Sequence, residues 1–246
     1  MKERKFSIIF KLLVVISLLA GILLNVVHTT SISAILSYYT LQSNIVCLIM
    51  FLGIIIAIMS KNNYRTNSIY YLLKGGTIMA ILITGITYQI ALAPNNFYMD
   101  ISYTMRTERY WANLLVHVIS PILVLLDYVL FDEKGNFKYY YPIIWLFLPL
   151  SYVIYVYSYS ARGGSFYGIG GSREFAYIFL DYNRIGYSGV FKSIIIIAIL
   201  ILLVSYFFVF LDRKLKRKWF DEKRVRRVSY LFFFYEYTNL CKIIDK

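Results

Sequence analysis

Polar residues gather at the start of an apolar stretch, in the sequence YYTLQSNIV at positions 38–46. Thr40, Ser43 and Asn44 are spaced i, i+3 and i+4, so a helix would present them on one face. Gln42 adds a fourth polar group. In a lipid-like environment each unsatisfied polar group costs several kcal/mol. The cluster therefore needs either interhelical partners or a chemical role.

A second polar group lies in the apolar stretch WANLLVHVISPILVLLDYVLF at positions 111–131. Asn113 and His117 stand four residues apart and share one helical face. A histidine can move a proton near neutral pH, and a threonine hydroxyl becomes a nucleophile once an adjacent base takes its proton. If the two stretches pack together, Thr40 and His117 are candidates for the nucleophile and base of an ester-cleaving site.

Amide side chains near this pair could donate hydrogen bonds to a developing oxyanion, as they do in other enzymes. The candidate substrate-binding residues are Gln42, Ser43, Asn44, Gln89, Asn113 and Asp181. A simpler interpretation is that such groups bond to helix carbonyls and hold helices together. Two histidines without a convergent acidic cluster give too few ligands for a metal, and the distant Cys47 and Cys241 form no metal motif. The sequence therefore predicts no metal and no other cofactor.

The composition of the chain is that of a membrane protein. Hydrophobic residues make up 59% of the 246 residues and charged residues only 16%, where a soluble domain carries about 25%. Six apolar stretches reach the roughly 20 residues that span a bilayer. They lie at positions 6–27, 34–59, 69–93, 111–131, 139–159 and 190–211. The sequence therefore predicts an all-α, polytopic membrane protein, with a six-helix transmembrane bundle over residues 1–211 and a basic cytoplasmic tail over residues 212–246.

The basic residues determine the expected orientation. With the N-terminus inside, 20 of the 26 lysines and arginines fall on the cytoplasmic side, which is the positive-inside pattern. We therefore expect an integral membrane protein with both termini cytoplasmic. The net charge of +13 then needs no nucleic acid to explain it. The basic run at positions 213–218 is expected to contact anionic lipid headgroups.

In this topology the second and fourth helices both run from outside to inside. Thr40 and His117 each lie six residues into their helices, which places both about 9 Å below the outer ends at 1.5 Å per residue. The third helix brings Gln89 near the same level. The sequence therefore predicts a polar pocket that opens toward the outer leaflet, with Asn44 and Asn113 in its wall.

Two regions flank this expected pocket. The inner halves of the helices are plainer in sequence, apart from Asp127, which is expected to be solvated or paired. The outer loop at positions 160–189 carries seven of the thirteen glycines together with many aromatic residues. Loops longer than about 15 residues are usually functional or disordered, and the aromatic residues favour a packed lid.

The segments YYTLQSN at 38–44, 111–131 and FAYIFLDYNRIGYSGV at 175–190 resemble a bacterial family of six-helix membrane proteins. That family is similar, more remotely, to the androgen-induced and androgen-dependent membrane proteins of animals. Those are intramembrane threonine hydrolases that cleave fatty acid esters of hydroxy fatty acids. The remote similarity consists of a threonine opening helix two and an Asn-x-x-x-His followed four residues later by proline. It implies that Thr40 is the nucleophile and His117 the catalytic histidine, in a bacterial cytoplasmic membrane.

Three functions are compatible with the sequence. The leading hypothesis is an intramembrane hydrolase that cleaves a lipid ester in an outer-leaflet pocket, with a membrane lipid or lipid ester as its partner. The alternative is a non-enzymatic membrane regulator or sensor that binds a lipid or another ligand. A transporter is the least favoured, because the chain has neither an inverted repeat nor a broken helix with paired Gly and Pro at the midplane.

Overall fold

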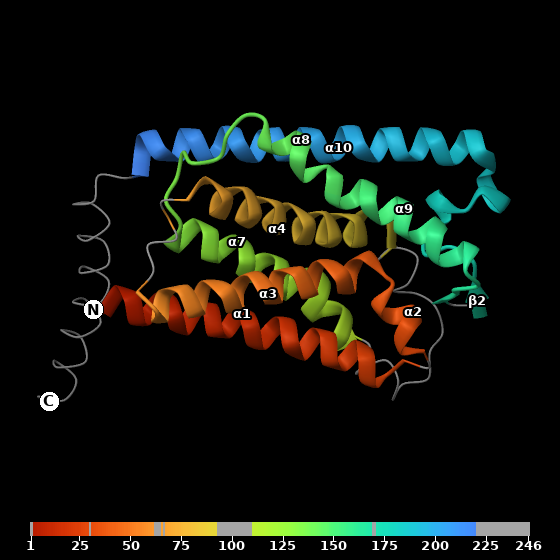
Figure 1. The fold of residues 1–246 in the computed structure, drawn as a ribbon, viewed down its shortest axis with the longest axis horizontal. Helices are drawn as coiled ribbons and strands as arrows, with labels where there is room; N and C mark the ends of the chain where they lie inside the picture. Colours follow the sequence, from red (N-terminus) through yellow and green to blue (C-terminus); the bar gives the residue numbers. More distant parts are fainter. Residues whose placement is uncertain are drawn as a thin grey trace, which may run out of the picture.

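The computed structural model describes residues 2–29, 31–61, 65, 67–92, 110–168 and 171–219. Within these residues the regular secondary structure is helical apart from one short hairpin. Six helices are long and apolar enough to cross a membrane. They pack together into one bundle (Figure 1), so the predicted fold class is confirmed. Most of the predicted basic tail, residues 220–246, and the outer segment at 93–109 lie outside the described residues.

The six spans are built from the following elements. α1 covers Lys2–Val27, α3 covers Tyr39–Met59, and α4 covers Ser68–Thr87 and continues as the π-helical turn η2, Tyr88–Leu92. The span Tyr110–Phe131 contains the π-helical turn η3, Leu115–Ile119, and α7, Ser120–Phe131. α8, Tyr141–Trp145, leads into α9, Phe147–Ala161, and α10 covers Tyr182–Trp219 with a break at Gly186. The short elements are α2, Ile32–Leu36; β1, Phe166–Gly168; β2, Gly171–Arg173; and η4, Ile178–Leu180.

The second predicted helix is interrupted near its start, so the expectation of one helix over 34–59 is wrong there. The Ser31 side chain caps a separate short helix, α2. Tyr38 is then extended, with φ −76° and ψ 139°, before α3 begins. Thr40 is therefore the second residue of α3, and does not lie nearly two turns inside a helix.

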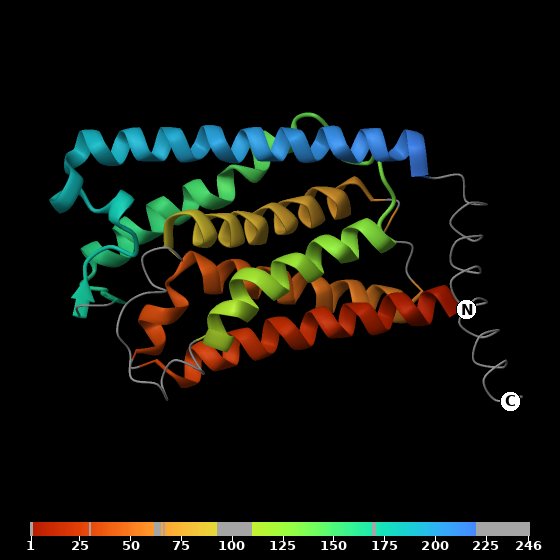
Figure 2. The same ribbon diagram turned by 180° about the vertical axis from the view of Figure 1, so that it is seen from behind.

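The bundle has two recognisable ends. α1 begins and α10 ends at one of them, and α2 and the hairpin lie at the other, which we call the outer end (Figures 1 and 2). α1, α3, α4 and α7 pack against one another, whereas α10 runs along one side of the bundle in both views. The beginning of α1 and the end of α10 therefore lie on the same side of the bundle.

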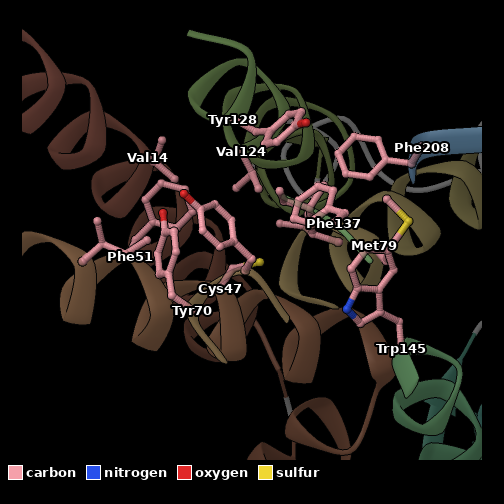
Figure 3. Packing of buried hydrophobic residues seen from close by; sticks show 14 of the residues in the cluster. Val14, Cys47, Phe51, Tyr70, Met79, Val124, Tyr128, Phe137, Trp145 and Phe208 are labelled. Carbon is pink, nitrogen blue, oxygen red and sulfur yellow. The ribbon is translucent and has the colours of Figure 1, made fainter. Parts of the chain in front are cut away.

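Aromatic side chains fill the core toward the inner end. Tyr128, Phe137 and Phe208 lie against one another, with ring centroids 5.0–5.5 Å apart (Figure 3). Trp145 of α8 crosses α4 at Gly75, where an added Cβ would come within 2.1 Å of the indole. α8 can therefore pack directly on the α4 backbone, which places α9 and α10 beside α4.

A buried ion network joins three helices in the inner half of the bundle, contrary to the expectation that this half is plain. Lys11 of α1 and Lys74 of α4 donate to the two carboxylate oxygens of Asp127 of α7, at 2.6 and 2.7 Å. Lys74 also lies 3.5 Å from Asp132. All four side chains are at most 3% exposed. Asp127 is therefore paired, which is one of the two states expected for it.

A second layer of polar contacts continues from this network toward the inner end. Tyr70 donates to Asp132 at 2.8 Å, Tyr128 donates to Asp212, and Lys134 donates to the carbonyls of Tyr128 and Asp132. The two layers together hold three lysines and three aspartates, so their charges balance. Burial lowers the pKa of Lys134 to about 8, although Asp132 and Asp212 act in the opposite direction.

The described part of the outer loop is a packed lid. Phe166, Phe175 and Leu180 are buried against Tyr152 and Val156 of α9. β1 and β2 pair antiparallel beside them. The expectation of a packed aromatic lid is confirmed for these residues.

Candidate functional site

A cavity of about 260 Å³ lies between α3, α4, α9 and α10, and the lid contributes part of its wall. Thr40 and His117 both line it. Thr84, Tyr152 and Tyr177 also contribute polar groups, and most of the other lining residues are aliphatic. The two side chains that the sequence selected as nucleophile and base therefore face one cavity, although they come from different helices.

Thr40 sits at the N-terminus of α3, with 8% of its surface exposed. Its backbone carbonyl accepts hydrogen bonds from the Asn44 side chain at 2.7 Å and the Ser43 hydroxyl at 3.0 Å. These bonds hold the first turn of the helix in place. The N-terminus of a helix carries a partial positive charge, so negative charge that develops beside Thr40 would be stabilised.

His117 lies in the π-helical turn η3 and is 7% exposed. Ser120 donates its backbone N–H to the carbonyl of Leu115, five residues back. Pro121 has no N–H with which to bond the His117 carbonyl, and this weakens the α-helical pattern at this point. π-Helical turns inside helices are frequent at functional sites. The His117 carbonyl would lie 2.9 Å from a Cβ added at Gly85. The glycine therefore allows α4 to approach η3 closely.

The His117 ring is fixed on one face and retains one free nitrogen. Tyr88 stacks on it with ring centroids 3.9 Å apart and an interplanar angle of 11°. One ring nitrogen is in hydrogen-bonding contact with the backbone of Thr84, whereas the buried Nδ1 has no partner. A buried, unpartnered imidazole nitrogen can accept a proton from a hydroxyl or a water in the cavity.

Tyr177 of the lid is a site residue that the sequence analysis missed. It lines the cavity together with Thr40 and Tyr152, and its hydroxyl interacts with the side chains of both. Burial raises its pKa, so the hydroxyl stays protonated and can donate a hydrogen bond. Its position within an aromatic-rich loop was the only sequence signal, and many tyrosines of this chain share it.

Three predicted substrate-binding residues lie on α3 and bond to groups outside the cavity lining. The Ser43 hydroxyl bonds to that of Thr84 at 2.7 Å. The Asn44 amide also reaches the carbonyl of Val116 at 3.3 Å, while its Oδ1 has no partner. Gln42 bonds to the carbonyl of Leu36 at 3.4 Å. None of the three is part of the cavity lining.

The other three predicted substrate-binding residues also lie outside the lining. Asn113 is partly buried and Gln89 is exposed. Asp181 accepts a bond from the backbone N–H of Asn183 at 3.0 Å and pairs with Arg184 at 3.3 Å. The wall that was expected to contain Asn44 and Asn113 is therefore formed by threonine, tyrosine and aliphatic side chains.

Within the described residues, no hydrogen bond joins the Thr40 hydroxyl directly to the His117 ring, and the His117 Nδ1 has no partner. The same part of the chain contains no group of three His, Cys, Asp or Glu side chains that could hold a metal ion. Among the lining residues that the structure describes, none is charged. The arrangement is suited to acid–base and nucleophilic chemistry on a neutral, apolar molecule.

Neither a family model, nor a curated protein, nor a solved structure matches this chain.

Proposed function

We propose that this protein is an intramembrane hydrolase that cleaves a lipid ester, with Thr40 as the nucleophile and His117 as the base. One observation carries the proposal: two buried side chains of the required types, from separate helices, line one largely apolar cavity. The resemblance to the bacterial family, and through it to the intramembrane threonine hydrolases of animals, supports the same roles for both residues. The cavity walls are suited to the apolar part of a lipid.

The proposed chemistry uses groups already in the cavity. The Thr40 Oγ attacks the ester carbonyl, and its proton passes to the free Nδ1 of His117, directly or through one water. Apo geometry of such pairs is often looser than in the substrate complex. The tetrahedral intermediate then expels the alcohol, which takes the proton from His117. Water, deprotonated by His117, then attacks the acyl-threonine, the fatty acid leaves, and His117 returns the proton to the Thr40 Oγ.

Tyr177 is the best-placed donor for the developing oxyanion. Gln42 and Asn44, the amides first considered for this role, donate instead to backbone carbonyls. The Tyr177 hydroxyl is beside Thr40, where the carbonyl carbon must lie during attack. The N-terminus of α3 adds a favourable dipole at the same place.

The experiment is a comparison of ester turnover by purified variants in liposomes, with a fatty acid ester of a hydroxy fatty acid as substrate. Thr40→Ala should abolish turnover, and Thr40→Ser should retain part of it because the hydroxyl survives. Thr77→Ala is the matched control, since Thr77 is also buried, is not part of the cavity lining, and its hydroxyl donates to the carbonyl of Leu73 in its own helix. Equal turnover by the wild type and Thr40→Ala would overturn the proposal.

A non-enzymatic lipid-binding regulator is the second candidate. It is favoured by the absence of a direct bond between Thr40 and His117 among the described residues and by the predominantly apolar lining. The two functions differ in what remains after purification. A regulator would retain a bound lipid intact, detectable by mass spectrometry, and would release no fatty acid from an added ester.

We also propose that the inner end of α10 contacts anionic lipid headgroups, with both termini cytoplasmic. Lys214 and Lys216 are exposed there. Replacing both by serine should reduce retention of phosphatidylglycerol in native mass spectrometry, whereas Lys192→Ser, an exposed position nearer the outer end of α10, should not. Thiol labelling of a cysteine placed beyond residue 219 from the external side only would contradict the orientation.

A further inference from the structure

The cavity is polar at one end and apolar along the rest of its length. Its hydroxyl groups and His117 come from the outer ends of α3 and α4, from η3, from Tyr152 of α9 and from the lid. Toward the inner half the walls are aliphatic, and they end at Leu146, between α8 and α9, and at Val204 of α10. A molecule with one polar end and one extended apolar end matches this distribution.

The length of the apolar part follows from the geometry of α10. Its lining residues run from Ile194 to Val204 along one face, which corresponds to about 15 Å at 1.5 Å per residue. Three successive bonds of an extended chain span about 3.5 Å, so this distance accommodates about 12 carbons. Among the described residues, those that line the inner end are apolar, which matches the end of a hydrocarbon chain.

The cavity also reaches the lipid-facing surface of the bundle. α10 contacts η4 near its outer end and α8 further along the helix, and its inner end is held by the contacts of Asp212 and Arg213 with Phe137. Between these contacts, the lining residues Ile90 and Leu200 are 74% and 55% exposed. Ile90 follows the outer end of α4 and Leu200 lies at the middle of α10, so the opening between them faces sideways into the bilayer.

We propose that the cavity is a binding site for one unbranched acyl chain of about 12 carbons, which enters sideways from the membrane between α4 and α10. The chain lies along α10, and its carboxyl or ester group is at the end formed by Thr40 and His117. This inference deepens the proposed function and rests on it for the position of the ester. The site for the chain itself follows from the cavity alone.

The test uses binding, so that it does not depend on turnover. The wild type in liposomes is illuminated with a 12-carbon fatty acid that carries a diazirine at mid-chain, and the adducts are mapped by mass spectrometry. Adducts should concentrate on the cavity face of α10, at Ile197, Ala198 and Ile201. Adducts spread equally over lipid-facing positions such as Leu203, which is 61% exposed, would overturn the proposal.

Chain length provides a second, independent measurement by competition with unlabelled fatty acids. Ile201 lies seven residues from Ile194, or about 10.5 Å along the helix, so Ile201→Trp should leave space for about 9 carbons. The fatty acid that competes best should therefore be about three carbons shorter for this variant than for the wild type. Ile201→Phe replaces it if the tryptophan variant does not fold. Leu203→Trp is the matched control and should retain the wild-type profile. Identical profiles for the Ile201 and Leu203 variants would contradict the site.

The outcomes separate this inference from the proposed function. The expected cross-linking pattern without ester turnover would support the acyl-chain site and reject the hydrolase. Turnover that depends on Thr40, without cross-linking to α10, would support the hydrolase and reject the acyl-chain site.

Discussion

Replacement of Asp127 by asparagine removes one charge from the centre of the buried ion network and preserves the shape of the side chain. Lys11 would then lose its counter-charge and keep uncharged partners, among them the Ser7 hydroxyl at 3.2 Å and the face of Phe131 at 4.8 Å. Lys74 would keep Asp132 at 3.5 Å. The larger part of the cost therefore comes from Lys11, which would be left as a buried ammonium without a counter-charge.

The magnitude follows from measurements on comparable buried pairs. Loss of one partner costs about 3–5 kcal/mol, because the remaining charge stays buried, whereas an exposed pair contributes about 0–1 kcal/mol. Lys11 and Asp127 are both 0% exposed. We therefore expect Asp127→Asn to lower the free energy of unfolding by about 3–5 kcal/mol. The double variant Lys11→Met/Asp127→Asn should recover most of it, since the uncompensated charge is gone.

The assay is equilibrium unfolding in lipid bicelles by steric trapping, which gives the free energy of unfolding for each variant. A cost of less than about 1 kcal/mol for Asp127→Asn would contradict a buried, uncompensated charge on Lys11. Simple addition of the effects of Lys11→Met and Asp127→Asn would contradict it as well, because two groups in direct contact should show a coupling energy.

Three further predictions concern the site and the inner end of the bundle. His117→Ala should reduce ester turnover as strongly as Thr40→Ala, and the double variant should be little worse than either, because members of one catalytic unit are not additive; additive losses in steady-state kinetics would speak against a shared role. Tyr177→Phe should lower kcat about 10²- to 10³-fold, as for loss of one oxyanion donor, with KM nearly unchanged; a rise in KM alone would indicate a binding role instead. The Lys134 pKa of about 8 lies below the ordinary value for lysine. Between about pH 8 and 10.5 the unfolded chain therefore holds more protons than the folded one, and stability should rise with pH there. Melting curves of Lys134→Met should lack this rise, and an unchanged rise would contradict the lowered pKa of Lys134.

The membrane architecture could be predicted from the sequence because it depends on length and hydropathy alone. Each apolar stretch is long enough to span a bilayer, and the helices observed overlap all six. The interruption before α3 was missed because residues 34–38 are as apolar as a helix requires. Only the cap at Ser31 and the extended Tyr38 reveal it.

The inner ion network could not be predicted because it depends on contacts between distant residues. Lys11 and Lys74 each appear in sequence as an isolated charge near the inner end of an apolar stretch, where contact with water or headgroups is the ordinary expectation. Their burial becomes visible only when α1, α4 and α7 are packed around Asp127.

The candidate site was predicted in part. The similar depth of Thr40 and His117 correctly indicated that they share one cavity, even though Thr40 lies closer to its helix terminus than expected. The amide residues were expected in the wall, but side-chain direction depends on helix rotation, and Asn44 turns toward Val116. Tyr177 comes from a loop whose path has no periodicity in the sequence.

The most direct test of Thr40 as the nucleophile and His117 as its base is to identify the residue that carries a covalent adduct after reaction with an alkyl fluorophosphonate. Such reagents modify activated hydroxyl groups, and peptide mass spectrometry locates the adduct. The proposed mechanism predicts modification of Thr40 in the wild type and its loss in His117→Ala, with Thr77→Ala labelled like the wild type. An adduct on another residue, or labelling of Thr40 that persists in His117→Ala, would contradict the assignment of Thr40 and His117 as nucleophile and base.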